Sequence, residues 1–268
     1  MKNIITLFLI ATILYSCSND NDTAQNEPFV LPFNSNNYWT YDITDDTQNN
    51  SRDSLYVEND TVINGKTYKK MKAKDNVAIG FYSNSLNNNG IKVSGNKLLL
   101  SGTFSLNNDQ NLPFNFSLVL DDFIAFDADA PLDGNPSTRS GIIQEEVNGY
   151  PLIINYILKS VGGNSYPNYT SPDGNTYSDV KSGKIVLNIK VTSTQEVSGI
   201  PITITILQPQ DVIISEQFVA KNIGVVHTHT ISQYNLDSQF AQEISNQLNI
   251  PTSYIGNQFE YLDTYVIN

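Results

Sequence analysis

Cysteine is almost absent from this sequence, since Cys17 is the only one among 268 residues. A single cysteine cannot form a disulfide within the chain, so stability must come from the core, which a domain of this size can supply. Basic residues are also few, at 15 Lys and Arg against 27 Asp and Glu, and the formal net charge is −12. Phosphate backbones repel an acidic protein, so we predict no nucleic-acid partner.

Long hydrophobic runs are absent as well. The longest apolar stretch, residues 4–15, has about a dozen residues, whereas a transmembrane helix needs about 20. It follows Lys2 and ends in Leu14-Tyr15-Ser16-Cys17. A positive start, an apolar core, a small residue and a cysteine resemble a bacterial lipoprotein signal peptide with its lipobox. An ordinary cleaved secretion signal and a retained membrane anchor are the alternatives.

The resemblance implies that residues 1–16 are removed and that Cys17 is the lipidation site, carrying acyl chains such as palmitate. Each buried methylene contributes about 0.8 kcal/mol, and two or more chains hold a protein stably on a bilayer. We therefore expect an outer membrane lipoprotein that faces the periplasm or is exposed at the cell surface. Residues 17–28 are mostly polar, which predicts an acylated flexible tether. Residues 29–268 are predicted to form a single domain.

Most of the remaining chain has the alternation that is typical of strands. Asn64-Gly65 lies between two such segments and predicts a two-residue hairpin. Gly, Asn, Asp and Pro separate the segments, which favours an antiparallel β fold. The predicted strands include 77–83, 91–106, 114–126, 150–161, 184–194, 200–207, 211–215, 225–234 and 259–267.

One helix is predicted near the C-terminal end of the chain. Phe240, Ile244 and Leu248 recur at helical spacing, Asp237 can cap the first turn, and Ile250-Pro251 ends the helix. The predicted fold class is therefore mainly β, with a large antiparallel sheet curled into an incomplete barrel and one short helix. A β-sandwich is the alternative fold.

Two predicted strands are apolar on both faces, at residues 151–158 and 200–207. The second face of such a strand needs a cover, which can be another sheet, the helix or a bound apolar molecule. A filled core and a ligand site therefore both remain open. This pattern indicates a possible apolar small-molecule partner.

Two short segments carry a resemblance to a family. Asn37-Tyr38-Trp39-Thr40-Tyr41 resembles the entry strand of many secreted lipoproteins, and residues 218–226 resemble their late "Y-x-A-K-G-I-G-x-V" segment. Such proteins are similar to the LolA/LolB-like group. The resemblance implies a curled antiparallel sheet with helices closing its mouth, and a hollow that binds acyl chains or other apolar molecules. No ligand-binding residue can be transferred by position.

Histidine is limited to His227 and His229. Two residues apart on a strand, they lie on one face and could supply half of a zinc or iron site. An outer polar stripe is the alternative. The acidic Asp127–Asp133 segment fails the EF-hand pattern because Pro131 and Leu132 occupy positions five and six, which leaves a weaker calcium site or a solvated turn. We predict no metal site, and both segments stay open as alternatives.

Residues 164–179 contain Tyr166, Tyr169 and Tyr177 among two prolines and one glycine. Aromatic side chains on a rigid loop can stack on sugars or on a partner protein, or they can fix the loop to the sheet. Nucleophile-elbow and phosphate-loop motifs are missing. We therefore predict no enzyme and no cofactor, but a membrane-anchored envelope lipoprotein that binds a hydrophobic or amphipathic ligand in a curled sheet. A surface adhesion or glycan-binding module is the alternative, and the oligomeric state stays undetermined.

Overall fold

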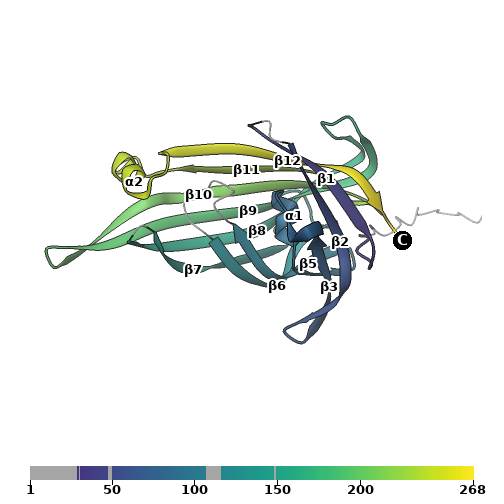
Figure 1. Ribbon diagram of the computed structural model, residues 1–268, viewed down its shortest axis with the longest axis horizontal. Coiled ribbons are helices and arrows are strands. Elements are labelled where there is room, and N and C mark those ends of the chain that lie inside the picture. The colour runs from purple at the N-terminus through teal and green to yellow at the C-terminus, as the bar shows by residue number, and fades with distance from the viewer. Residues whose placement is uncertain (1–28, 30, 48–49, 107–115, 148) are drawn as a thin grey trace, which may run out of the picture.

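The computed structural model describes residues 29, 31–47, 50–106, 116–147 and 149–268. The predicted signal peptide (1–16), Cys17 and the tether (17–28) lie outside the described residues. Twelve antiparallel strands form one curled sheet in the order β6-β5-β4-β3-β2-β1-β12-β11-β10-β9-β8-β7 (Figure 1). Its elements are β1 (Tyr38–Asp45), β2 (Asn50–Ile63), β3 (Lys66–Ala73), η1 (Lys74–Asn76), α1 (Phe81–Leu86), β4 (Gly90–Ser94), β5 (Lys97–Leu106), β6 (Phe116–Asp127), β7 (Ser137–Val147), β8 (Tyr150–Thr170), β9 (Thr176–Val197), β10 (Ile200–Ala220), β11 (Gly224–Asn235), α2 (Ala241–Leu248) and β12 (Ser253–Val266).

The sheet is almost closed, but its edge strands β6 and β7 do not pair as strands. Backbone bonds tie the β6–β7 connection to β8: Asp133 N donates to Gly162 O at 2.9 Å, and Gly162 N donates to Gly134 O at 2.8 Å. Arg139 Nη2 of β7 donates to Asp121 O of β6 at 2.8 Å. The structure thus confirms the mainly β, incomplete-barrel prediction, and the β-sandwich alternative does not apply.

The predicted hairpin at Asn64-Gly65 is confirmed. Both residues have positive φ, at 51° and 77°, between β2 and β3. This is the backbone that a two-residue turn of the favoured mirror-image type requires, and Asn-Gly adopts it with little strain.

The two segments that carried the lipoprotein resemblance contact each other. Trp39 is buried and its Nε1–H donates to Ile223 O at 2.6 Å, while the hydroxyl of Tyr41 donates to Val225 O at 3.0 Å. Gly224 lies between these carbonyls with φ of 105°, and an added Cβ would lie 3.2 Å from Trp39 Nε1. The entry strand therefore fixes the turn between β10 and β11 by direct hydrogen bonds across 184 residues of sequence.

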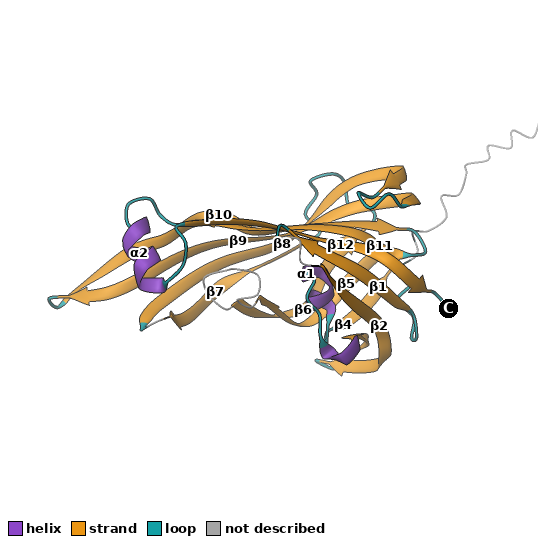
Figure 2. Ribbon diagram, turned by 45° about the horizontal axis from the view of Figure 1, so that its top comes forward, coloured by secondary structure: helices purple, strands orange, loops and turns teal. Residues whose placement is uncertain are grey.

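The interior of the curled sheet contains helix α1, where the sequence had predicted a strand over 77–83. That prediction was wrong. The apolar side chains of Phe81, Tyr82 and Leu86 are buried among β2, β3 and β5, and Figure 2 shows α1 lying inside the sheet. Valine and aromatic residues favour strands, but here Gly80 and the contacts inside the sheet select one helical turn and a half.

Helix α2 confirms the short helix near the C-terminal end, although its start differs. It begins at Ala241, because Asp237 accepts from Gln239 N at 3.1 Å and forms a turn before the helix. Ile244 and Leu248 are buried, as the spacing predicted, and Asn249 ends the helix in the left-handed conformation. Neither described helix has the length and apolarity that crossing a membrane would require.

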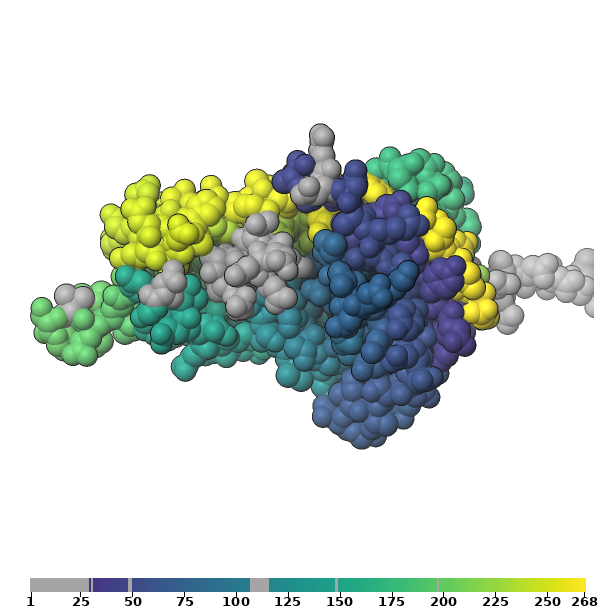
Figure 3. All heavy atoms as spheres, viewed as in Figure 1, coloured from purple at the N-terminus to yellow at the C-terminus, as the bar shows by residue number. Residues whose placement is uncertain are grey.

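The long strands leave apolar side chains uncovered on their second face. Ile157 of β8 and Ile200 and Ile202 of β10 are exposed. On the same two strands, Leu158 and Leu207 are fully buried. The predicted cover of both faces is therefore absent at these positions. The β9–β10 hairpin that carries Ile200 extends beyond the rest of the molecule (Figure 3). Strand β7 was not predicted, since its Ser, Arg, Gln and Glu side chains lie at an exposed edge.

Burial predicts that Leu86→Ala and Val119→Ala lower the free energy of unfolding by very different amounts. Leu86→Ala removes a buried side chain of α1 and should lower the free energy of unfolding by about 2–5 kcal/mol. Val119→Ala, on the outward face of β6, should change it by less than about 0.5 kcal/mol. Urea denaturation followed by tryptophan fluorescence measures both. Equal effects would contradict the burial of α1 inside the sheet.

Candidate functional site

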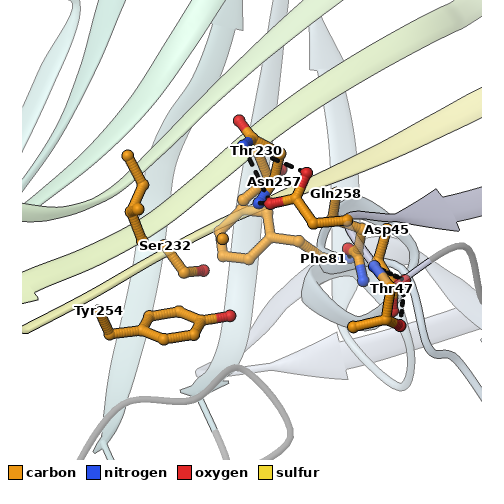
Figure 4. A pocket seen from close by; sticks show the side chains of 11 residues that line it. Asp45, Thr47, Phe81, Thr230, Ser232, Tyr254, Asn257 and Gln258 are labelled. Carbon is orange, nitrogen blue, oxygen red and sulfur yellow. Dashed lines mark hydrogen bonds between the residues drawn. The ribbon is translucent and has the colours of Figure 1, made fainter. Parts of the chain in front are cut away.

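A pocket of about 230 Å³ opens on the concave face of the sheet beside α1. Strands β11 and β12 form one wall, the turn after β1 forms the opposite wall, and the first residue of α1 lies between them (Figure 4). Eight of the eleven lining residues have polar side chains. The lining consists of Asp45, Asp46, Thr47, Phe81, Thr230, Ser232, Tyr254, Ile255, Gly256, Asn257 and Gln258.

The register of β11 and β12 places these polar side chains together. Thr230 pairs with Gln258 and Ser232 pairs with Gly256, and paired residues of antiparallel strands share a face. Thr228, one step along the same face, pairs with Glu260. Alternation therefore directs the threonines and Ser232 inward, and His227 and His229 outward.

Glycine at position 256 lets an aromatic ring lie across the strand. A Cβ added to Gly256 would come within 2.1 Å of the Tyr254 hydroxyl oxygen, so the tyrosine side chain occupies the space above this residue. Tyr254 also stacks on the buried ring of Tyr234, with centroids 6.1 Å apart. In Figure 4 the Tyr254 ring forms the side of the pocket opposite Asp45 and Thr47.

The carboxylates of the pocket come from the last residue of β1, Asp45, and from Asp46 in the turn that follows. Asp45 pairs with Gln258 in the sheet register, and its Oδ1 accepts from the backbone N–H and the hydroxyl of Thr47 at 2.8 and 2.6 Å. Asp46 Oδ2 accepts from the backbone and side-chain nitrogens of Asn257 at 2.7 and 3.1 Å. These bonds fix both carboxylates at the rim, and the lining contains no Lys, Arg or His.

The floor of the pocket is the beginning of α1. Phe81 N donates to Gln258 Oε1 at 2.7 Å, and Gln258 Nε2 donates to Ile79 O at 3.3 Å. The side-chain amide of Gln258 thus bonds both Ile79, which precedes α1, and Phe81, the first residue of α1. Gln258 is therefore held in one orientation beneath the pocket.

Two buried carboxylates hold α1 from below this floor. Glu260 is fully buried and accepts from Tyr82 N at 2.6 Å and from the Ser83 hydroxyl at 2.8 Å. Asp53 Oδ2 accepts from Ile79 N and Gly80 N, both at 2.8 Å. A Cβ on Gly80 would overlap Glu260 Oε2 at 2.2 Å, so the helix can approach the carboxylate only with glycine here.

Burial is the main cause of the unusual titration of Glu260. The pKa of Glu260 is raised from 4.5 to about 7, because burial and, to a smaller extent, nearby Asp53 raise it more than the hydrogen bonds from Ser83 and Tyr82 lower it. Burial likewise raises the pKa of Asp53 against the bonds from Gly80 and Ile79. Both carboxylates serve to hold α1, because the bonds to Glu260 come from its first turn and the bonds to Asp53 come from Ile79 and Gly80 just before it.

The apolar interior on the other side of α1 is almost filled. The space between Phe81, Leu86, Leu100, Phe123 and neighbouring apolar side chains has a volume of about 20 Å³. This is room for about one water molecule. Helix α1 therefore occupies the hollow of the curled sheet, and the pocket of about 230 Å³ lies at its polar mouth.

His227 and His229 lie on the outer face, where aromatic rings surround them. His227 Nδ1 bonds the hydroxyl of Tyr169 at 2.6 Å, and its ring stacks 5.0 Å from that of Tyr261. His229 Nε2 bonds Asn257 Oδ1 at 2.9 Å. Burial lowers the pKa of His227 to about 4, and His229 adds to the effect. Within the described ranges, no three His, Cys, Asp or Glu residues are grouped so that they could hold a metal ion.

The tyrosine segment 164–179 is the hairpin end of β8 and β9, and it packs on the outer face of the sheet. Tyr169 stacks on Phe218 with centroids 4.4 Å apart, and Tyr166 contacts both rings. Tyr177 donates to Leu262 O at 3.5 Å. Stacking on Phe218 covers one of the two ring faces of Tyr169.

The acidic segment Asp127–Asp133 forms a turn at the end of β6. Asp127 Oδ1 accepts from Asp129 N at 3.0 Å, and Asn96 Nδ2 donates to Asp129 at 3.0 Å. The carboxylates of Asp127 and Asp129 thus bond to neighbouring groups of the chain. Cys17, the predicted lipidation site, lies outside the described residues.

Sequence reasoning missed the pocket at the mouth. It assigned residues 225–234 to a strand but considered only the face with the two histidines. The signal was present on the other face, where Thr228, Thr230 and Ser232 alternate with the outward side chains. Three hydroxyl residues on the inward face of a strand indicate a polar lining, but the facing residues of β12 and of α1 cannot be assigned without the register.

No family model, curated protein or solved structure matches this chain. The site therefore rests on its own geometry. The similarity to the LolA/LolB-like group remains a prediction from the two sequence segments.

The two shifted pKa values give opposite dependences of stability on pH. Between pH 4.5 and about 7 the folded chain keeps a proton on Glu260 that the unfolded chain releases, so this contribution is present below pH 4.5 and is lost as pH rises through about 7. Between about pH 4 and 6.5 the unfolded chain protonates His227 while the folded chain does not. That contribution is present above pH 6.5 and is lost as pH falls towards 4.

Single substitutions should separate these two contributions. In Glu260→Gln, the free energy of unfolding should increase with pH between 4 and 6.5 more steeply than in the wild type, because Glu260 no longer opposes the contribution of His227. In His227→Gln it should decrease more steeply between pH 4.5 and 7. In each variant, the free energy of unfolding should differ from the wild-type pH profile by about 1–3 kcal/mol across the stated pH range. Urea unfolding across this range measures it, and unchanged pH profiles in both variants would refute the assignment.

Proposed function

We propose that this protein is a membrane-anchored, non-catalytic lipoprotein of the cell envelope that binds a small amphipathic molecule on the concave face of its sheet. The observation that carries the proposal is the pocket of about 230 Å³ at the mouth of the curled sheet. Concave sites that combine apolar surface with a few fixed polar groups are the usual places for small ligands. The pocket has both kinds of group.

The filled interior favours an amphipathic ligand over a wholly apolar one. A hydrocarbon chain has no space in the cavity of about 20 Å³ behind α1, whereas the mouth offers a larger volume with hydroxyl and carboxylate groups. The rings of Tyr254 and Phe81 supply apolar surface to the lining.

The roles of the buried carboxylates support a binding function. Glu260 and Asp53 accept hydrogen bonds from the backbone around the start of α1, and both lie below the floor of the pocket. Their hydrogen bonds go to the protein itself, so they act in positioning the helix. The polar groups that line the pocket can orient a ligand.

The anchor is proposed from the sequence, and the described domain is consistent with it. Leu31 and Phe33 pack against the domain, with the Phe33 and Trp39 rings 5.3 Å apart, so the folded body begins just after the predicted tether. Asn37 Nδ2 donates to Pro32 O at 2.6 Å and fixes this segment. A tether of residues 17–28 would let the body reach into water while Cys17 holds the membrane.

The anchor predicts a defined behaviour for the cysteine variant. Cells fed labelled palmitate should incorporate it into the wild-type protein, which should require detergent for extraction. Cys17→Ser should carry no label and should appear in the aqueous wash, because the acyl chains supply the membrane affinity. A Ser16→Ala variant, which keeps the small residue before the cysteine, serves as control. Wild-type protein without label, or an equal distribution of both proteins, would refute the anchor.

The ligand site can be tested by filling it. Native mass spectrometry of the purified protein should detect a co-purifying small molecule, and Ser232→Trp should lose it because the indole occupies the pocket. Thr264→Trp, on the exposed surface of the adjoining strand β12, should retain it. A molecule that is retained by Ser232→Trp would place the site elsewhere, and its absence from every preparation would remove the proposal.

A further inference from the structure

We propose that the pocket at the mouth of the sheet takes an uncharged sugar ring, either free or as the polar end of an amphipathic molecule. This inference rests on the proposed function and names the chemical class of its ligand. It follows from the size, the hydrogen-bonding groups, the apolar walls and the charge of the pocket.

The size of the pocket limits the ligand group to about one ring. Its volume of about 230 Å³ is below the roughly 300–1,000 Å³ of sites for drug-sized ligands. The pocket is closed below by Phe81 and Gln258 and laterally by the turn after β1. A single six-membered ring with its substituents fits these dimensions better than an extended chain.

The hydrogen-bonding groups match a molecule with several hydroxyls. Carboxylate oxygens accept hydrogen bonds, so beyond their bonds within the chain Asp45 and Asp46 match a ligand group that donates, and bonds from O–H to carboxylate are among the stronger ones. Ser232 and Thr230 add hydroxyls that can donate or accept. Each sugar hydroxyl has both capacities, so it can bond either kind of group.

The apolar walls match the other property of a sugar. A pyranose ring has C–H bonds on one or both faces, and these pack against aromatic rings. Tyr254 lies over Gly256 at one side of the pocket, and Phe81 lies in its floor. The arrangement offers ring contacts at the side and floor and polar contacts at the rim, where Asp45 lies.

The charge of the lining disfavours anionic ligands. The lining contains the carboxyl groups of Asp45 and Asp46 and no Lys, Arg or His, and the whole chain has a formal charge of −12. Like charges at close range are unfavourable in a partly enclosed site. A phosphate or carboxylate on the ligand would therefore weaken binding at this position.

The site is held in position before any ligand arrives. Asn257 is fixed by Asp46 and His229, and Gln258 is fixed by the backbone of Ile79 and Phe81. A binding site whose side chains are already ordered loses less entropy on association. The rim and the floor thus form a rigid frame around the pocket.

Matched sugars test the inference directly. Glucose, galactose, mannose and N-acetylglucosamine are titrated into the full chain, with backbone amide NMR shifts at Ser232, Gly256 and Asn257 as the readout. Glucuronate and galacturonate, which differ from the first two sugars by a carboxylate, serve as anionic counterparts. At least one neutral sugar should shift these amides, and its uronate should bind at least 10-fold more weakly.

A charge-neutralising variant provides the second arm. Asp45→Asn keeps the shape of the side chain and an oxygen that can accept the bonds from Thr47. It should lower the affinity for the neutral sugar about 10-fold, and it should reduce the ratio of the affinity for the neutral sugar to the affinity for its uronate. Asp42→Asn makes the same change of net charge on β1 outside the lining, where Asp42 pairs with Arg52, and should leave both affinities unchanged. Urea denaturation of both variants reports whether each one folds.

Every outcome decides for or against the sugar. Neutral-over-uronate discrimination that falls in Asp45→Asn alone supports it. Equal binding of the uronates overturns the inference. If none of the sugars shifts the amides of the pocket, the inference is also overturned. If a small molecule nevertheless co-purifies with the wild type and is absent from Ser232→Trp, the proposed binding function survives with a ligand of another class. If that molecule is missing too, the proposed function fails as well.

Discussion

A buried carboxylate needs hydrogen-bond donors, and in this protein Glu260 finds them in the first turn of α1. Four groups donate to its oxygens, namely the N–H groups of Tyr82 and Ser83 and the hydroxyls of Ser83 and Thr228. The arrangement places a short helix inside the curled sheet, where three of its apolar side chains fill the hollow. It also places the polar start of that helix at the open end, which creates the floor of the pocket. The filled interior and the polar mouth therefore have one cause.

The closure of the sheet depends on contacts other than strand pairing. Between β6 and β7 a few bonds from Arg139, Asp133 and Gly162 replace a ladder, whereas β1 and β12 pair along eight residues of β1. On the far side, the Trp39 indole and the Tyr41 hydroxyl bond the turn between β10 and β11. The two sequence segments with the lipoprotein resemblance thus have a shared structural role, which is to join the entry strand to the late strands.

The fold was predictable from the sequence wherever alternation and turn chemistry agree. Asn64-Gly65 specified its hairpin, and Ile244 and Leu248 specified the buried face of α2. Helix α1 was not predictable, because Val77, Phe81 and Tyr82 favour strands locally and the donors required by Glu260 lie 178 residues away in sequence. Strand β7 was missed because an exposed edge strand needs no apolar alternation. The length of β8 was missed because Gly162-Gly163 looks like a break, although the structure accommodates a register shift there.

The candidate site shows the same limit. The inward hydroxyls of Thr228, Thr230 and Ser232 can be read from one strand, but their partners come from β12, α1 and the turn after β1. Hydrogen exchange of the Tyr82 and Ser83 amides tests most directly whether the buried carboxylate holds α1 in the sheet. Exchange as slow as that of the paired amides of β11 and β12 is the expected result, since both N–H groups are buried and bonded. Exchange as fast as in an exposed loop would contradict it.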